Sequence, residues 1–353
     1  MSWVPPADFD DDDPFDKYDG VIYDRAGTRS NRPRSKQRPK YPDALSGMVI
    51  TVDRGRYQVV LGAGSTAQSE FSGRQITATR SSALRKQSLV VGDQVDLVGD
   101  FSGADGTLSR VVNIHERSTL LRRSADDTDQ VERIVVANAE QLLIVVAAEN
   151  PTPRPRLIDR YLVGAFDAKI QPILYITKTD LADPAPLIAE FDCLDLQIVT
   201  GTKDEPPLAE LLALLEGKIT VAVGHSGVGK STLVNALVPG TDRATGVVNQ
   251  VTGRGRHTSS SSYALQLPDK NGWIIDTPGV RSFGLGHIDP ANVIKTFASH
   301  AIDSPTPEGE VPLAEAHDWE IIERIKAGEL GVSGQHRIDS FVTILENLGA
   351  KPD

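Results

Sequence analysis

Residues 224–231 have the types and spacing of a loop that wraps phosphate groups. Glycines let successive backbone N–H groups face an anion at the start of a helix, whose dipole also favours negative charge. The strand-like run 218–223 precedes this segment and a helix-like run beginning at Thr232 follows it, so a chance glycine turn is the weaker interpretation. The phosphate-contacting set is Gly224, His225, Ser226, Gly227, Val228, Gly229, Lys230, Ser231 and Thr232.

A second segment, Thr177 to Asp180, has the chemistry to distinguish guanine from adenine. The Asp180 carboxylate accepts hydrogen bonds from the ring N–H and the amino group of guanine, whereas adenine would place an acceptor against it. Lys178 would lie along the base and brace the phosphate loop. Thr177 stands where Asn is commoner. The run 171–176 predicts a strand that carries this segment at its carboxyl end, where open α/β sheets bind ligands.

The loop after the next strand-like run, 196–199, is expected to contact the guanine oxygen. Thr200 and Gly201 stand there and would use backbone N–H groups.

Three side chains are predicted to hold Mg²⁺. Ser231 would supply one hydroxyl and Thr258 a second, while Asp276 would act through a water. Gly279 closes an Asp-x-x-Gly sequence, and its amide would sense the terminal phosphate. Thr258 lies in the glycine-rich, basic and hydroxyl-rich run 253–262, which predicts a switch loop rather than a packed element.

The usual water-orienting glutamine is absent from this sequence. Val280 follows the Asp-x-x-Gly sequence where Ras-like enzymes carry glutamine, and it has no hydrogen-bonding atom. Slow intrinsic hydrolysis is therefore expected. His257 is the candidate to orient water, together with Lys230 and Thr258 as catalytic groups; an RNA contact or a local loop bond is an equally open role for His257.

The order of the two nucleotide motifs is inverted. In ordinary GTPases the phosphate loop comes first, but here the base-reading segment at 177–180 precedes the loop at 224–231. This order predicts a circularly permuted GTPase.

With this order, the strings at 255–258, 276–281, 137–141 and 158–163 resemble the bacterial ribosome small-subunit-dependent GTPases, the RsgA or YjeQ family. The resemblance implies late maturation of the small ribosomal subunit, rRNA binding, and GTP hydrolysis that the subunit stimulates and that controls release. A GTP-binding regulatory module and a metabolic nucleotide-dependent enzyme remain alternatives, although no acceptor site or separate catalytic base is evident.

The expected fold class is α/β, with an N-terminal OB-fold β-barrel, a circularly permuted P-loop GTPase domain and a small C-terminal helical domain. Short strand-like runs at 47–52, 56–61 and 93–98, separated by glycine turns, suit the barrel. The predicted boundaries are 1–43 for an N-terminal arm, 44–118 for the barrel, 119–285 for the GTPase and 286–353 for the C-terminal helices.

Charge is segregated in this chain of net charge −11. Residues 8–13 hold five aspartates, whereas residues 25–40 hold seven basic side chains and no acid. Such a basic, structureless arm is typical of segments that order on phosphate backbones, although a merely solvated tail is the plain alternative. An ordinary soluble barrel surface would explain scattered arginines in the barrel equally well, but the cations that could face RNA are Arg54, Arg56, Arg74, Arg80, Arg85 and Lys86.

The C-terminal region departs from the family, whose members usually carry zinc there on three cysteines and a histidine. Residues 281–353 contain no cysteine, and His287, His300, His317 and His336 lack compact spacing. Helical apolar spacing predicts that apolar packing alone holds this region. The expected cofactors are GTP or GDP and Mg²⁺, without zinc.

The remaining sequence features concern location and association. Cys193 is the single cysteine, so no internal disulfide can form. No apolar run approaches the length of a membrane span and the N-terminus lacks a signal peptide's apolar stretch. We therefore expect a cytoplasmic monomer.

Overall fold

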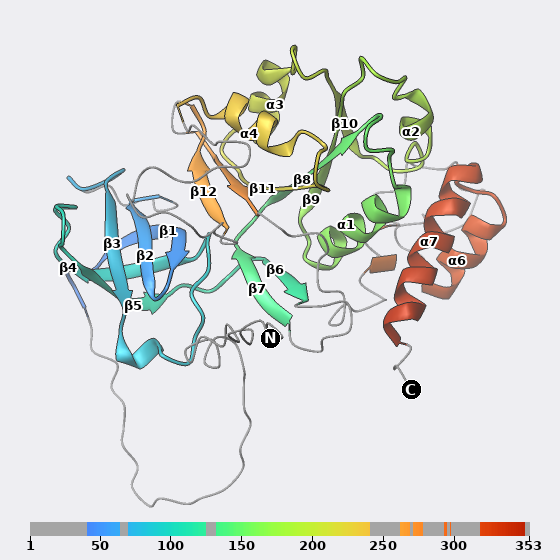
Figure 1. Cartoon of the computed structure of the whole chain (residues 1–353). Coiled ribbons are helices and arrows are strands. Elements are labelled where there is room, and N and C mark those ends of the chain that lie inside the picture. The colour runs from blue at the N-terminus through green and yellow to red at the C-terminus, as the bar shows by residue number, and fades with distance from the viewer. Residues whose placement is uncertain are drawn as a thin grey trace, which may run out of the picture.

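A computed structural model places three regions in chain order: a small barrel, a parallel sheet flanked by helices, and a pair of C-terminal helices (Figure 1). The structure describes residues 41–63, 70–124, 132–240, 262–268, 271–277, 293, 294, 297 and 318–349. Within these ranges, no helix is both long enough and apolar enough to span a bilayer.

The barrel closes through five strands in the order β1, β2, β3, β5, β4 and back to β1. Only β3 and β5 pair in parallel, which is the strand order of an OB barrel. Alternate residues point inward, so Val49, Val59 and Val95 fill the interior. The strands are β1 (Leu45–Asp53), β2 (Arg56–Leu61), β3 (Gln75–Arg80), β4 (Gln94–Gly99) and β5 (Ser109–Ile114), with a short 3₁₀ turn, η2 (Ser82–Leu84). The strand runs expected from the sequence are confirmed.

A hairpin of β6 (Leu120–Ser124) and β7 (Glu132–Ala137) connects the barrel to the parallel sheet. Asn138, just after β7, holds this junction: its side-chain N–H donates to Gly92 O at 2.9 Å and its oxygen accepts the Ser118 amide at 2.8 Å. Gly92 has φ +91°, and a Cβ there would meet Ala137 O at 2.0 Å. The string at 137–141 is therefore part of the contact between the two regions.

The second region is a six-stranded sheet in the order β10, β9, β8, β11, β13, β12. All neighbours pair in parallel except β12, which runs antiparallel to β13. The strands are β8 (Gln141–Ala147), β9 (Gln171–Thr177), β10 (Gln197–Thr200), β11 (Ile219–Val223), β12 (Tyr263–Gln266) and β13 (Trp273–Asp276). The helices are α1 (Pro155–Asp167), α2 (Ala185–Ala189), α3 (Leu208–Leu215) and α4 (Lys230–Leu237).

Both faces of this sheet are covered, which explains why β8 is buried at every position. Its alternate residues Leu142 and Ile144 belong to a cluster with α1, while Leu143 and Val145 belong to a cluster with α3 and α4. Because the strands are parallel, β9, β10, β11 and β13 all present their carboxyl ends at one edge. That edge is where the sequence places its candidate site.

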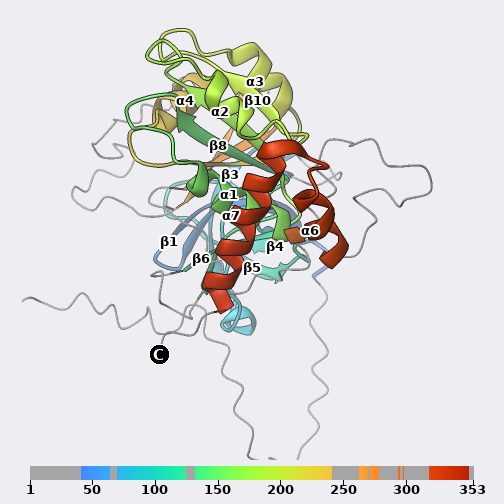
Figure 2. The ribbon, with the colours of Figure 1, turned by 90° about the vertical axis from the view of Figure 1, so that its right-hand side faces the viewer.

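The C-terminal helices α6 (Asp318–Lys326) and α7 (Gly331–Gly349) lie beside α1 (Figures 1 and 2). Phe341 of α7 packs edge-on against Phe166 of α1 at 6.2 Å between ring centroids, and against Phe297 at 5.1 Å. These contacts agree with the predicted apolar packing.

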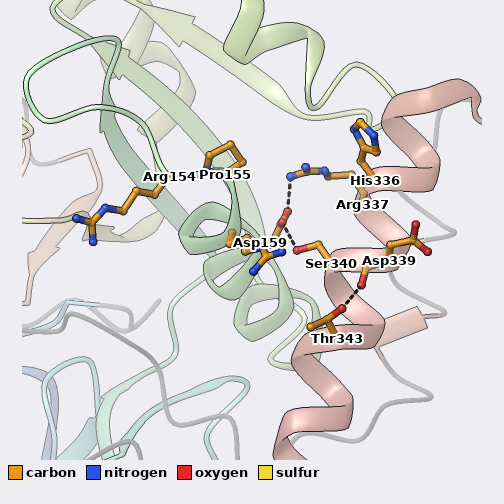
Figure 3. A pocket seen from close by; sticks show the side chains of 9 residues that line it. Arg154, Pro155, Asp159, His336, Arg337, Asp339, Ser340 and Thr343 are labelled. Carbon is orange, nitrogen blue, oxygen red and sulfur yellow. Dashed lines mark hydrogen bonds and ion pairs between the residues drawn. The ribbon is translucent and has the colours of Figure 1, made fainter.

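Apolar packing is not the whole account, so that prediction was wrong in part. Arg337 of α7 pairs with the buried Asp159 of α1 at 2.6 Å and with Glu190 at 3.1 Å. Ser340 donates a further hydrogen bond to Asp159 (Figure 3). Hydrophobic spacing within one helix could not reveal this network, because its partners lie more than a hundred residues away in the sequence.

Candidate functional site

The phosphate loop joins β11 to α4, with α4 beginning at Lys230. Gly227 and Gly229 have φ of +84° and +97°, a backbone conformation that side chains with Cβ rarely adopt. At Gly224 a Cβ would meet Val145 O at 2.5 Å, so the loop could not lie this close to β8 with any other residue. Val228 is buried in the cluster beneath α4 and anchors the loop.

The base-reading segment braces this loop directly. Thr177 Oγ1 lies 2.6 Å from Val228 O and 3.1 Å from Val146 O, so its hydroxyl proton has a carbonyl acceptor in the loop and another in β8. Lys178 donates to Gly227 O at 2.9 Å and also to Asn150 O. Threonine therefore makes the loop-to-loop contact although asparagine is commoner at that position.

The loop after β10 lies beside the same segment. The Gly201 amide donates to Ile176 O at 3.0 Å, and the Thr179 amide donates to Gly201 O at 3.4 Å. Asp180 and Thr200 are exposed, with the Asp180 carboxylate open to solvent at the carboxyl edge of the sheet. The structure thus brings 177–180, 200–201 and the phosphate loop together.

The end of β13 brings the acidic residue to the phosphate loop. Asp276 is buried and forms an ion pair with Lys230, whose side chain is 14% exposed. Thr277 donates to Ala222 O at 3.2 Å, which holds the chain against β11 just beyond Asp276. Ser231 is half-buried and Thr232 is exposed on the first turn of α4.

Three of the predicted site residues lie outside the described part of the chain. They are His257, Thr258 and Gly279. Residues 1–40 of the N-terminal arm and three of the four C-terminal histidines, His287, His300 and His317, also lie outside it, whereas His336 is exposed on α7. Among the described residues, no three His, Cys, Asp or Glu side chains gather as metal ligands would.

Comparison with known proteins gives a family. The RsgA GTPase family profile matches residues 114–286. The small ribosomal subunit biogenesis GTPase RsgA of Chlorobaculum tepidum is 33% identical over 259 residues, which cover 71% of this chain and 82% of that protein. This chain belongs to the RsgA family. The protein of the same name from Pseudomonas aeruginosa is 36% identical over 68% of this chain and 70% of its own length.

Two solved structures share the fold of this RsgA family chain. The crystal structure of YjeQ from Thermotoga maritima matches with a TM-score of 0.61, covering 88% of this chain and 100% of that one at 23% identity. The structure of YloQ, a circularly permuted GTPase, matches with a TM-score of 0.59 over 89% and 99% of the two chains at 21% identity. They support the predicted α/β fold with its barrel and permuted sheet.

The residues of this RsgA chain fit a phosphate group and a divalent cation. The loop at 224–229 turns through glycines at 224, 227 and 229 and leads into the start of α4, where backbone N–H groups can bind an anion. Asp276 and Ser231 are oxygen ligands of the kind that Mg²⁺ prefers, and Lys230 lies beside them.

Two contacts in the site were not predicted from the sequence. Asn150 O accepts from Lys178, and the Tyr263 hydroxyl donates to Asp276 Oδ2 at 3.4 Å. Both pair residues that are distant in sequence, so no local spacing could indicate them. A tyrosine at the start of a short strand carries no motif by itself.

A hollow of about 700 Å³ lies away from the phosphate loop, between α1 and α7 (Figure 3). Its lining includes Arg154, Asp159, His336 and Arg337. Burial raises the pKa of Asp159 to about 6, although the Arg337 guanidinium and the Ser340 hydroxyl favour the ionised form. Asp159, Arg337 and Ser340 serve the contact between α1 and α7 rather than the nucleotide edge.

Cys193 lies near the same contact and is buried. Burial raises the pKa of its thiol to about 11, which keeps it protonated at neutral pH.

Proposed function

We propose that this chain is a GTPase that acts in biogenesis of the small ribosomal subunit, and that binding to the subunit stimulates GTP hydrolysis, which in turn controls release. One observation carries the nucleotide part: Thr177 and Lys178, beside the base-reading Asp180, contact the carbonyls of Val228 and Gly227 in the phosphate loop. Membership of the RsgA family and the names of its relatives support the ribosomal part.

The base is read at the edge of β9 and β10. Asp180 would accept the two guanine N–H groups, and the aliphatic part of Lys178 would lie along the ring while its ammonium holds Gly227 O. The backbone of Thr200 and Gly201 would meet the guanine oxygen. The exposure of Asp180 supports this role, because a ligand can reach it.

The phosphates are held by the loop between β11 and α4. Backbone amides of residues 225–232 would face the phosphate oxygens, and Lys230 would leave Asp276 to pair with them. Ser231, Thr258 and Asp276 would hold Mg²⁺, which when bound neutralises charge on the phosphates. The Gly279 amide would report the terminal phosphate.

Water activation depends on the switch run. Val280 cannot orient water, so intrinsic hydrolysis is slow, and docking on the subunit orders the run and places His257 beside the attacking water. His257→Ala tests this role. Loss of stimulated turnover with GTP and subunit affinity retained supports it, whereas full stimulated turnover eliminates it.

RNA contact is assigned to the basic arm at 25–40 and to the barrel. Arg54, Arg56 and Arg85 are exposed on the barrel. Arg74 is exposed too but donates to the Phe101 and Ser102 carbonyls, and Arg80 donates to the Gln87 carbonyl. Lys86 is exposed beside Arg85. The protein acts as a cytoplasmic monomer with Mg²⁺ and without zinc; elemental analysis that found one zinc per chain would contradict the metal assignment.

The direct test measures GTP turnover with and without purified small subunits. Stimulation several-fold or more by the subunit, and none by large subunits, supports the proposal. Asp180→Asn is the matched variant: it should weaken GTP binding and favour xanthosine nucleotides, whose ring oxygen needs a donor. Unchanged GTP affinity in this variant would remove the base-reading assignment, and turnover that ignores the subunit would remove the ribosomal one.

A further inference from the structure

Tyr263 lies in a row of paired residues that crosses the junction between the barrel and the GTPase sheet. In β12 it is opposite Asp276 of β13 on one side and Thr51 of β1 on the other. Directly opposed residues in a sheet project from the same face. Tyr263 and Asp276 therefore share the face covered by α4, which carries Lys230.

The two oxygens of the Asp276 carboxylate have different partners. Oδ1 pairs with Lys230 and Oδ2 accepts from the Tyr263 hydroxyl at 3.4 Å. The Asp276 side chain is only 3% exposed, so its orientation depends on protein groups rather than on bulk water. Of these two partners, Tyr263 is not needed by the phosphates.

We infer that Tyr263 is a positioning residue that keeps Asp276 aimed at the Mg²⁺ site when Lys230 moves to the nucleotide. The inference rests on the proposed GTPase function. A neutral hydroxyl suits this role, because it fixes one carboxylate oxygen without neutralising the charge that attracts the cation.

The strand that carries Tyr263, β12, is paired on both sides, which fixes the position of the Tyr263–Asp276 contact. β1 pairs with β4 along residues 45–48 and then with β12 at Thr51, and its register shifts between Val49 and Thr51. Such a bulge bends a strand, which lets one edge of β1 serve two partners. Tyr263 is thereby held from the barrel side as well as from β13. It also stands five residues after Thr258 in the sequence, directly after the predicted switch run.

The test compares full-length Tyr263→Phe with the wild type in binding of fluorescent GDP and GTP over a range of Mg²⁺ concentrations and in EDTA. The variant keeps the ring and removes the hydroxyl. The Mg²⁺ concentration for half-maximal tightening should rise about three- to tenfold, as expected for one hydrogen bond to a charged group. Affinity in EDTA and the unfolding midpoint without nucleotide should stay as in the wild type.

Tyr57→Phe is the matched control, because Tyr57 is a buried tyrosine of the barrel strand β2, and it should leave the Mg²⁺ requirement unchanged. An unchanged Mg²⁺ requirement in Tyr263→Phe would overturn the inference. Equal weakening with and without Mg²⁺, or a lower unfolding midpoint, would show a structural role and also overturn it. A wild type that binds no guanine nucleotide would instead refute the proposed function.

Discussion

Two buried ion pairs, one at the phosphate loop and one between α1 and α7, each contain an aspartate, but the cation differs between them. Lys230 pairs with Asp276 at the start of α4, and Arg337 pairs with Asp159 at the C-terminal helices. The side chains are 14% and 3% exposed in the first pair and 5% and 0% in the second. Burial alone therefore does not separate a functional pair from a structural one.

The cations differ in how many contacts hold them. Lysine is a compact charge on a flexible stem, so Lys230 can exchange a carboxylate for a phosphate. Arg337 uses separate nitrogens for Asp159 and Glu190 and stacks its guanidinium 4.5 Å from the centre of the Phe191 ring. Moving it would break all three contacts. The number of contacts that hold the cation, rather than its burial, therefore indicates which ion pair can exchange its partner.

The largest effect is expected from breaking the Arg337–Asp159 pair, called the fixed pair below. Arg337→Met leaves Asp159 buried without its cation and should lower the free energy of unfolding by about 3–5 kcal/mol. Urea unfolding and hydrogen exchange of α7 measure this loss. The double variant Arg337→Met with Asp159→Leu should recover much of the lost free energy of unfolding, since no unpaired charge is then buried. A single variant as stable as the wild type would contradict the structural role of Arg337.

Breaking the Lys230–Asp276 pair should instead lower the rate of GTP hydrolysis. Lys230→Ala should reduce subunit-stimulated GTP turnover about 100- to 1000-fold, because a positive group beside the phosphates is lost. Unfolding free energy should change by less than for Arg337→Met, because the Tyr263 hydroxyl still donates to Asp276 when Lys230 is removed. Lys218→Ala, which removes a surface pair with Glu140, is the control and should leave turnover intact. Equal turnover in both variants would contradict the assignment of Lys230 to GTP hydrolysis.

The fixed pair should also respond to pH. The folded-state pKa of Asp159 is about 6, above the ordinary 3.8, so its contribution is present below pH 4 and is lost as pH rises through 6. The change is at most about 3 kcal/mol. Arg337 and Ser340 favour ionisation, while Glu190 opposes it. Urea midpoints between pH 4 and 7 should fall in the wild type and fall less in Asp159→Asn; identical slopes would contradict this assignment.

The smallest effect is expected at the brace of the phosphate loop. Thr177→Val keeps the shape but removes the donor to Val228 O, which should weaken GTP binding about fivefold, or about 1 kcal/mol. Thr177→Ser keeps the hydroxyl and is the matched control. Titration with fluorescent GTP measures both. If valine binds GTP as tightly as serine, the hydroxyl contact does not support the loop.

Much of the fold and site follows from local sequence. The barrel runs at 47–52 and 56–61, the strand before 177 and the glycine loop at 224–229 are indicated by alternation, apolar runs and turn residues. The prediction of purely apolar packing for the C-terminal helices failed at Arg337. In the sequence, Arg337 looks like an ordinary cation on a helix. Only the tertiary structure shows that Asp159, far away in the sequence, lies beside it.

The sequence by itself determined the order of the two motifs and the family, and it predicts that Asp180 reads guanine. These depend on residue types at close spacing, where a local motif is sufficient. The tertiary structure decided which distant groups meet: Thr177 with Val228, Tyr263 with Asp276, and Arg337 with Asp159. Strand register and helix packing set those contacts, and neither is encoded within the few residues that a motif spans.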